Sequence, residues 1–114
     1  MTDLNWTTST FLVTGAAGWL GSRLVEALTC GLPDLITPHF SPSPLRVRCL
    51  VLPGQDADRL RQLSPAVEIC EGDLRTAADA ERLCEGAAGA ILFHTAGIIH
   101  PSRVSEFYFI NVEG

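Results

Sequence analysis

The stretch "TGAAGWLG", Thr14 to Gly21, decides the fold of this chain. Its glycines, Gly15, Gly18 and Gly21, recur every third residue between an apolar run at 11–13 and a segment whose apolar residues have helical spacing. A glycine turn from a strand into a helix presents backbone N–H groups and the positive end of the helix dipole to a phosphate. Ordinary tight turns also use glycine, so the surrounding elements must decide between the two interpretations. No Gly-Lys-Ser/Thr follows, which excludes an ATP-hydrolysing phosphate loop.

Strand-like and helical patterns alternate along the rest of the chain. Apolar runs and helical spacing predict strands at 10–14, 46–52, 66–70 and 90–95, and helices at 18–30, 56–63, 76–85 and 102–112. Strands separated by helices of this length form parallel β-α-β units with right-handed crossovers. We therefore expect an α/β fold with four parallel strands in the order 3-2-1-4, helices on both faces and a dinucleotide across the carboxyl ends of the strands. This context favours a phosphate-binding glycine turn.

Single segments add detail to this arrangement. The strand "AILFHT" at 90–95 is apolar enough to be buried on both faces, which would make His94 a core histidine. Asp56 and Thr76 are candidate helix caps, and Gly31 would end the first helix. The proline-rich segment 32–45 joins a helix end to a strand start, so we interpret it as a loop insertion at the sheet edge away from the dinucleotide.

Composition excludes several classes of protein. The chain has 114 residues, enough for one domain, and a net charge of −5, which argues against a nucleic-acid partner. Its most apolar stretch, 86–99, falls short of the roughly 20 residues that span a bilayer, and the N-terminus lacks a basic signal region. We expect a cytoplasmic protein without a membrane partner. The four cysteines form no C-x-x-C pair and no metal spacing with histidine, so they are interpreted as reduced core thiols, with no metal site.

The glycine turn resembles the signature of the extended short-chain dehydrogenase/reductases, the NAD-dependent epimerase/dehydratase family. Three further segments agree in order and spacing: "GDL" at 72–74, "LFHTAG" at 92–97 and "NVEG" at 111–114. The resemblance covers nearly the whole chain. It implies that residues 1–114 are part of an NAD(P)-binding Rossmann domain, the N-terminal portion of such a protein, truncated before the catalytic half.

The resemblance also implies a set of cofactor-binding residues. In the family, the residue at Asp73 hydrogen-bonds the adenine and its neighbour packs on it, and the segment after the fourth strand lies against the nicotinamide-side ribose. Asp73 could instead cap the turn before the helix at 76, and Asn111 could join helix to strand rather than approach the cofactor. The implied site consists of Gly15, Ala17, Gly18, Trp19, Leu20, Gly21, Leu52, Asp73, Leu74, Thr95, Ala96, Gly97 and Asn111.

The end of the second strand normally selects between the two dinucleotides. A carboxylate there binds the ribose 2′-hydroxyl of NAD, and a basic residue binds the 2′-phosphate of NADP. Here the position is Leu52, which does neither; Arg48 lies within the strand and Asp56 just beyond it. The cofactor is therefore NAD or NADP, with a lean toward NAD because no arginine occupies the NADP position.

The catalytic residues of the resembled family are missing. The family uses Tyr-x-x-x-Lys, whereas all eight basic residues here are arginines and the single tyrosine, Tyr108, is followed four positions on by Val112. No catalytic residue is assigned. The first hypothesis is the dinucleotide-binding portion of an NAD-dependent epimerase/dehydratase or hydroxysteroid-dehydrogenase-like oxidoreductase, inactive alone. The alternative is a non-catalytic NAD(P)-sensing or regulatory Rossmann protein. In either case we expect self-association through a bare sheet edge at 90–95.

Overall fold

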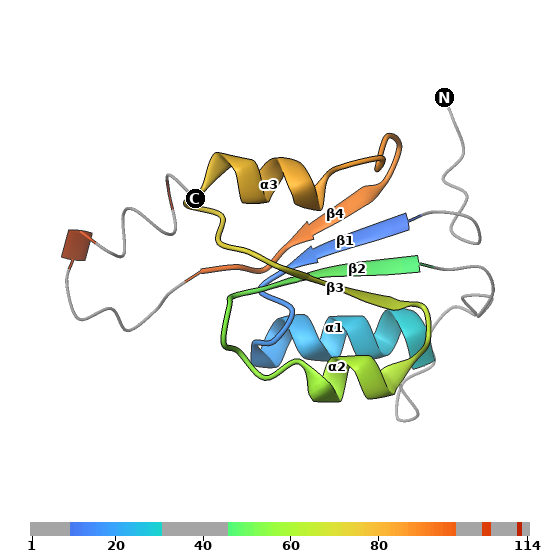
Figure 1. Cartoon of the computed structure of the whole chain (residues 1–114). Coiled ribbons are helices and arrows are strands. Elements are labelled where there is room, and N and C mark those ends of the chain that lie inside the picture. Colours follow the sequence, from blue (N-terminus) through green and yellow to red (C-terminus); the bar gives the residue numbers. More distant parts are fainter. Residues whose placement is uncertain (1–9, 31–45, 98–103, 106–111, 113–114) are drawn as a thin grey trace.

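A computed structural model describes residues 10–30, 46–97, 104–105 and 112 of the chain (Figure 1). In chain order, its elements are β1 (Thr10–Thr14), α1 (Trp19–Cys30), β2 (Arg46–Val51), α2 (Asp58–Leu63), β3 (Val67–Glu71), α3 (Ala77–Leu83) and β4 (Ile91–His94). Each has a predicted counterpart whose ends differ by at most two residues. The proline-rich insertion at 32–45, the stop at Gly31, Asn111 and nearly all of the predicted helix at 102–112 lie outside the described residues.

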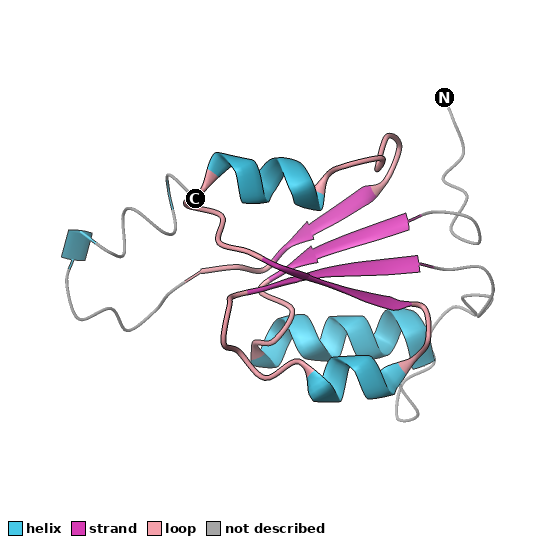
Figure 2. Cartoon of the chain, in the orientation of Figure 1, coloured by secondary structure: helices cyan, strands magenta, loops and turns pink. Residues whose placement is uncertain are grey.

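The four strands form one parallel sheet in the order β3-β2-β1-β4, as predicted. Helices α1 and α2 lie on one face of this sheet and α3 lies on the other, so both faces carry helices (Figure 2). The fold is the expected Rossmann type. Because all strands run in one direction, the glycine turn after β1 lies at the same edge of the sheet as the segments that follow the other three strands.

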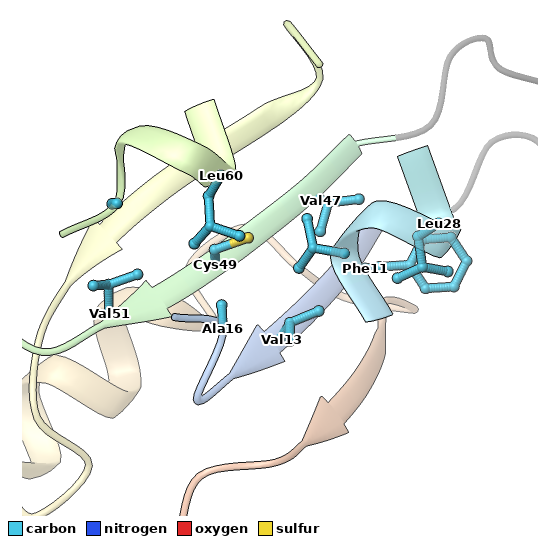
Figure 3. Packing of buried hydrophobic residues seen from close by; sticks show 10 residues of the cluster. Phe11, Val13, Ala16, Leu28, Val47, Cys49, Val51 and Leu60 are labelled. Atoms are coloured by element: carbon cyan, nitrogen blue, oxygen red, sulfur yellow. The ribbon is translucent and has the colours of Figure 1, made fainter. Parts of the chain in front are cut away.

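The main core lies between the sheet and the α1/α2 layer (Figure 3). Alternate residues of β1 and β2 point into it, and residues of both helices meet them: Phe11, Val13, Val47, Cys49, Val51, Val25, Leu28 and Leu60. The rings of Phe11 and Phe93 stack with centroids 5.9 Å apart, which ties β4 to this core. Leu12 and Leu50, on the opposite face, are also buried, so the two central strands are covered on both sides.

Charged side chains cross between β2 and β3 at the edge of the sheet. The Glu68 carboxylate of β3 forms two ion pairs: Oε2 lies 3.8 Å from Nη2 of Arg46, and Oε1 lies 3.5 Å from Nε of Arg48. Arg48 also donates to the carbonyl oxygens of Leu83 at 2.7 Å and Glu85 at 2.8 Å, at the C-terminal end of α3. Arginine at a helix C-terminus satisfies carbonyls that have no partner within the helix. Arg48 therefore fastens α3 to the sheet.

The expectation that the fourth strand is buried on both faces is wrong. Leu92 is 50% exposed and His94 is also exposed, whereas Ile91 and Phe93 on the other face are half-buried. The register places Leu92 beside Leu12, on the α3 side of the sheet. The seven-residue helix α3 leaves this side of β4 open to solvent. An apolar run in a sequence does not show which of its two faces a neighbour covers, which is why the prediction failed.

The cysteines also depart from the prediction of four core thiols. Cys49 alone is buried; Cys70 is half-buried, and Cys30 and Cys84 are exposed at the C-terminal ends of α1 and α3. A helix end projects beyond the layer that it packs on, so an apolar residue type there does not ensure burial.

We expect the thiols to react in an order set by this burial. Burial raises the pKa of the Cys49 thiol to about 12, so almost none of it is the nucleophilic thiolate at pH 8. Brief treatment of the folded protein with iodoacetamide should modify Cys30 and Cys84 and leave Cys49 unmodified, as read by peptide mass spectrometry. Unfolding in guanidinium should make all four react alike. Early modification of Cys49 in the folded protein would contradict the packing described here.

Within the described part of the chain, the helices are too short or too polar to cross a membrane, and three potential metal ligands are nowhere grouped together.

Candidate functional site

A cavity of about 260 Å³ lies at the carboxyl ends of the strands. Its wall combines the glycine turn, the end of β2, the turn after β3 and the segment after β4. The lining residues are Gly15, Gly18, Leu50, Leu52, Gln55, Gly72, Asp73, Leu74, Arg75, Thr95, Ala96 and Gly97. Eight of the predicted site residues are therefore brought to one place although they come from four separate parts of the sequence.

The three glycines of the turn meet different surroundings. Gly15 has φ +64°, and a Cβ on it would lie 2.8 Å from backbone atoms of Thr95 and Ala96. A Cβ on Gly21 would overlap the Gly15 carbonyl oxygen. A Cβ on Gly18 would meet only that same oxygen, at 3.2 Å, and Gly18 lines the cavity. The lack of a side chain at Gly15 thus lets the backbone after β4 approach the turn, and its lack at Gly21 lets the first turn of α1 pack against Gly15. At Gly18 it leaves the backbone accessible from the cavity.

Thr14, which was not among the predicted site residues, organises the cavity wall on the β4 side. Its side chain is buried, and its Oγ1 accepts the N–H groups of Thr95 at 3.0 Å and Ala96 at 3.2 Å. Oγ1 also lies 2.7 Å from Nδ1 of His94, which can accept the hydroxyl hydrogen. The Thr95 hydroxyl in turn donates to the Thr14 carbonyl oxygen at 2.5 Å. These bonds fix the segment after β4 against the glycine turn.

Replacing Thr14 with valine should loosen this wall. Valine has nearly the same shape but no hydroxyl, so the N–H groups of Thr95 and Ala96 would lose their acceptor, at a cost of about 1–3 kcal/mol in unfolding free energy. Thr14→Ser keeps the hydroxyl and serves as the matched control, with a smaller loss. Urea unfolding followed by circular dichroism measures both. Equal stability of Thr14→Val and the unaltered protein would show that the hydroxyl does not hold the segment.

The turn after β3 is organised by Asp73 and Arg75. The Arg75 guanidinium donates from Nη2 to Asp73 Oδ2 at 2.6 Å, and from Nε to both carboxylate oxygens at 3.0 and 3.1 Å. The backbone N–H of Arg75 also donates to Oδ1, at 2.9 Å. Thr76 stands at the N-cap position of α3, but its side chain makes no capping hydrogen bond. Asp73 caps the turn before this helix, because its Oδ1 accepts the Arg75 N–H.

The charge of Asp73 persists to lower pH than that of an ordinary aspartate. Hydrogen bonds from the Arg75 side chain lower the pKa of the Asp73 carboxyl. A carboxyl whose pKa is lowered by folding contributes stability above its unfolded pKa, about 3.9, and loses that contribution as the pH falls through the lower folded value. The pair is therefore intact at neutral pH.

The end of β2 presents neutral groups to the cavity. Leu52 is 45% exposed and lines it, as does Gln55, whose Oε1 accepts the Leu52 N–H at 3.1 Å. The two charged residues that left the cofactor choice open are used elsewhere. Arg48 binds the carbonyls at the end of α3, and Asp56 accepts the Asp58 N–H at 2.9 Å where α2 begins. The formal cap of α2 is Ala57, so Asp56 supports the helix start from one residue earlier.

Some predicted site residues lie beside the cavity rather than in its wall. They are Ala17, Trp19, Leu20 and Gly21, at the start of α1; Trp19 is 83% exposed. Four wall residues were missed: Leu50, Gln55, Gly72 and Arg75. Gly72 and Arg75 belong to or adjoin the "GDL" segment, so the sequence did contain a signal for them. Gln55 belongs to the "PGQD" turn and gave only a turn signal.

Comparison with known proteins agrees with this architecture. The sequence model of the NAD dependent epimerase/dehydratase family matches residues 11–114. The uncharacterized protein y4nL of Sinorhizobium fredii is 48% identical over 103 residues, which are 90% of this chain but 28% of that protein, so the chain spans less than a third of that relative's length.

Solved structures share the fold. A uronate dehydrogenase from Agrobacterium tumefaciens has a TM-score of 0.59 and 24% identity, with 91% of this chain and 32% of that chain covered. A short-chain type dehydrogenase/reductase from Mycobacterium ulcerans has a TM-score of 0.70 and 17% identity, with 96% and 43% covered. Together with the glycine turn and the parallel sheet, the match over residues 11–114 shows that this chain belongs to the NAD dependent epimerase/dehydratase family.

Proposed function

We propose that this chain binds NAD(P) in the cavity at the carboxyl ends of its strands, as the dinucleotide-binding portion of an NAD-dependent epimerase, dehydratase or related oxidoreductase. The observation that carries the proposal is the bare backbone at Gly18. It stands at the start of the 12-residue helix α1 and lines the cavity, where a Cβ would meet only the Gly15 oxygen. The first N–H groups of a helix lack intrahelical partners, and they and the helix dipole favour a pyrophosphate.

The other walls suit the remaining parts of a dinucleotide. Leu50, Leu52 and Leu74 offer apolar surface to an adenine ring, beside the carboxylate of Asp73. Thr95, Ala96 and Gly97 would lie along the nicotinamide-side ribose. The chain's own residues thus bind and orient the cofactor, and the nicotinamide, when bound, would supply the hydride acceptor or donor.

Turnover by this chain alone is a separate matter. The sequence contains no lysine, and the described cavity wall holds no tyrosine, so a Tyr-Lys acid–base pair is missing from both. Binding without turnover is the property that we propose for these 114 residues. It is shared by the enzyme portion and by the alternative, an NAD(P)-sensing protein.

Calorimetric titration with NAD⁺, NADH, NADP⁺ and NADPH tests the proposal directly. Titration with ADP-ribose and with nicotinamide mononucleotide then shows which half of the ligand the cavity holds. We expect ADP-ribose to bind and the mononucleotide to bind more weakly, since the apolar wall and Asp73 lie on the adenosine side. Failure of every dinucleotide and of ADP-ribose to bind a folded protein would refute the proposed function.

A further inference from the structure

We propose that Asp73 makes this site selective for NAD over NADP by holding and neutralising Arg75, the one cation in the described wall of the cavity. The inference rests on the proposed function, because it concerns which dinucleotide the same cavity accepts. It adds a selectivity residue on the turn after β3, whereas the sequence pointed only to the end of β2.

The described cavity wall contains two charged side chains, and these two bind each other. Asp73 and Arg75 are its only ionised side chains, and they share three side-chain hydrogen bonds of 2.6–3.1 Å. The backbone N–H of Arg75 binds the same carboxylate, which fixes the arginine relative to it. The summed charge of the described wall is therefore zero, and the guanidinium already donates from Nε and Nη2 to the Asp73 carboxylate.

The end of β2 adds no cation. The ribose 2′ substituent of a dinucleotide lies by this strand end in the fold. Leu52 there is apolar, the Gln55 side chain is neutral, and Arg48 is bound to the carbonyls at the end of α3. A 2′-phosphate carries a charge of about −1.5 to −2 at pH 7, as other phosphate monoesters do. It would enter a wall whose guanidinium is already neutralised by a carboxylate, and would gain little there.

Removing the negative charge of Asp73 should therefore leave the described cavity wall with a net positive charge, which favours a phosphate. Asp73→Asn keeps an oxygen that can accept the Arg75 N–H, so the turn can persist, but the amide cannot neutralise the guanidinium. The lost carboxylate also removes any bond to the adenine, a cost common to both dinucleotides. The ratio of the two dissociation constants cancels that common cost and reports the charge alone.

The experiment compares the dissociation constants of NADH and NADPH by nicotinamide fluorescence in five proteins: unaltered, Asp73→Asn, Arg75→Gln, the double variant and Leu52→Arg. The unaltered protein should bind NADH about tenfold more tightly than NADPH, as expected for one poorly compensated phosphate. Asp73→Asn should reduce this ratio at least about fivefold, more at low salt than at high salt. Arg75→Gln should keep the preference for NADH, and the double variant should restore it. Leu52→Arg, which adds a cation at the end of β2, is the positive control and should favour NADPH.

Several results would overturn the inference. One is an unchanged ratio in Asp73→Asn while Leu52→Arg shifts it; another is tighter binding of NADPH than of NADH by the unaltered protein. A ratio in the double variant equal to that in Asp73→Asn would show that the charge of Arg75 does not set the selectivity. Binding of neither dinucleotide by the folded, unaltered protein would instead overturn the proposed function, and this outcome is distinct from the others. Circular dichroism of each variant checks that it is folded.

Discussion

Replacing Gly21 with alanine is expected to destabilise the fold by about 3 kcal/mol or more, since it forces a backbone overlap in a packed interior. The added Cβ would overlap the carbonyl oxygen of Gly15, and it would lie 2.8 Å from the Gly15 carbonyl carbon and 2.9 Å from Cα of Ala16. Backbone atoms cannot turn aside as a side chain would, so α1 must shift away from the glycine turn. A domain of this size should lose roughly 10 °C or more in melting temperature for that cost.

Helix propensity and the steric overlap at Gly21 predict opposite changes in the stability of the fold, so the test distinguishes between them. Alanine is a better helix former than glycine by roughly 0.5–1 kcal/mol, so Gly21→Ala would stabilise α1 if nothing stood against it. Gly18→Ala is the matched control, because its Cβ would stand 3.2 Å from the same oxygen and needs only a small adjustment. Thermal unfolding should rank Gly21→Ala far below Gly18→Ala. A Gly21→Ala protein as stable as the unaltered one would contradict the close contact between helix and turn.

Gly18→Val should weaken dinucleotide binding more than tenfold, which corresponds to over about 1.4 kcal/mol. The valine side chain would stand on the cavity side of the turn and hold the pyrophosphate away from the start of α1. Calorimetry with NADH measures the loss. The effect should be largest for ligands that contain the pyrophosphate and small for adenosine alone, since adenosine does not reach the turn.

Ala88→Val serves as the control for added bulk. Ala88 is exposed in the turn after α3, outside the cavity wall, so this variant should bind NADH as the unaltered protein does. Equal affinities of Gly18→Val and Ala88→Val for NADH, with both proteins folded, would refute the phosphate-binding interpretation of the glycine turn.

The predictable part of this structure is the part encoded by short-range patterns. The helical spacing in 18–30 and the apolar runs that became β1 and β2 depend on neighbours a few residues away, and their ends were placed closely. The strand order followed because alternating elements leave few possible topologies. The Asp73–Arg75 pair joins residues two apart in the sequence, and it could have been anticipated beside the "GDL" segment.

What escaped prediction depends on contacts that the sequence does not display. The hydrogen-bond partners of Thr14 are 80 to 82 residues away in the sequence, so the residues around the glycine turn do not predict the hydrogen bonds of Thr14. Leu92 looked buried because its run is apolar, and Cys30 looked buried because free cysteines usually are. Both outcomes depend on whether another element covers that position. Residue type gives the tendency, and the packing partner decides the result.

The two edges of the sheet differ in charge, because the ion pairs of Glu68 with Arg46 and Arg48 lie at the β3 edge. On the β3 margin, Glu68 and Glu71 are exposed, and acidic side chains discourage a further strand from pairing there. On the β4 margin, the described strand offers the apolar residues 91–93 and no charge in that run. If two copies paired through their β4 edges, the outer edges of the combined sheet would be the two charged β3 edges. Such a twofold contact would occupy both β4 edges at once, so association by this route would end at a dimer instead of extending into a fibre.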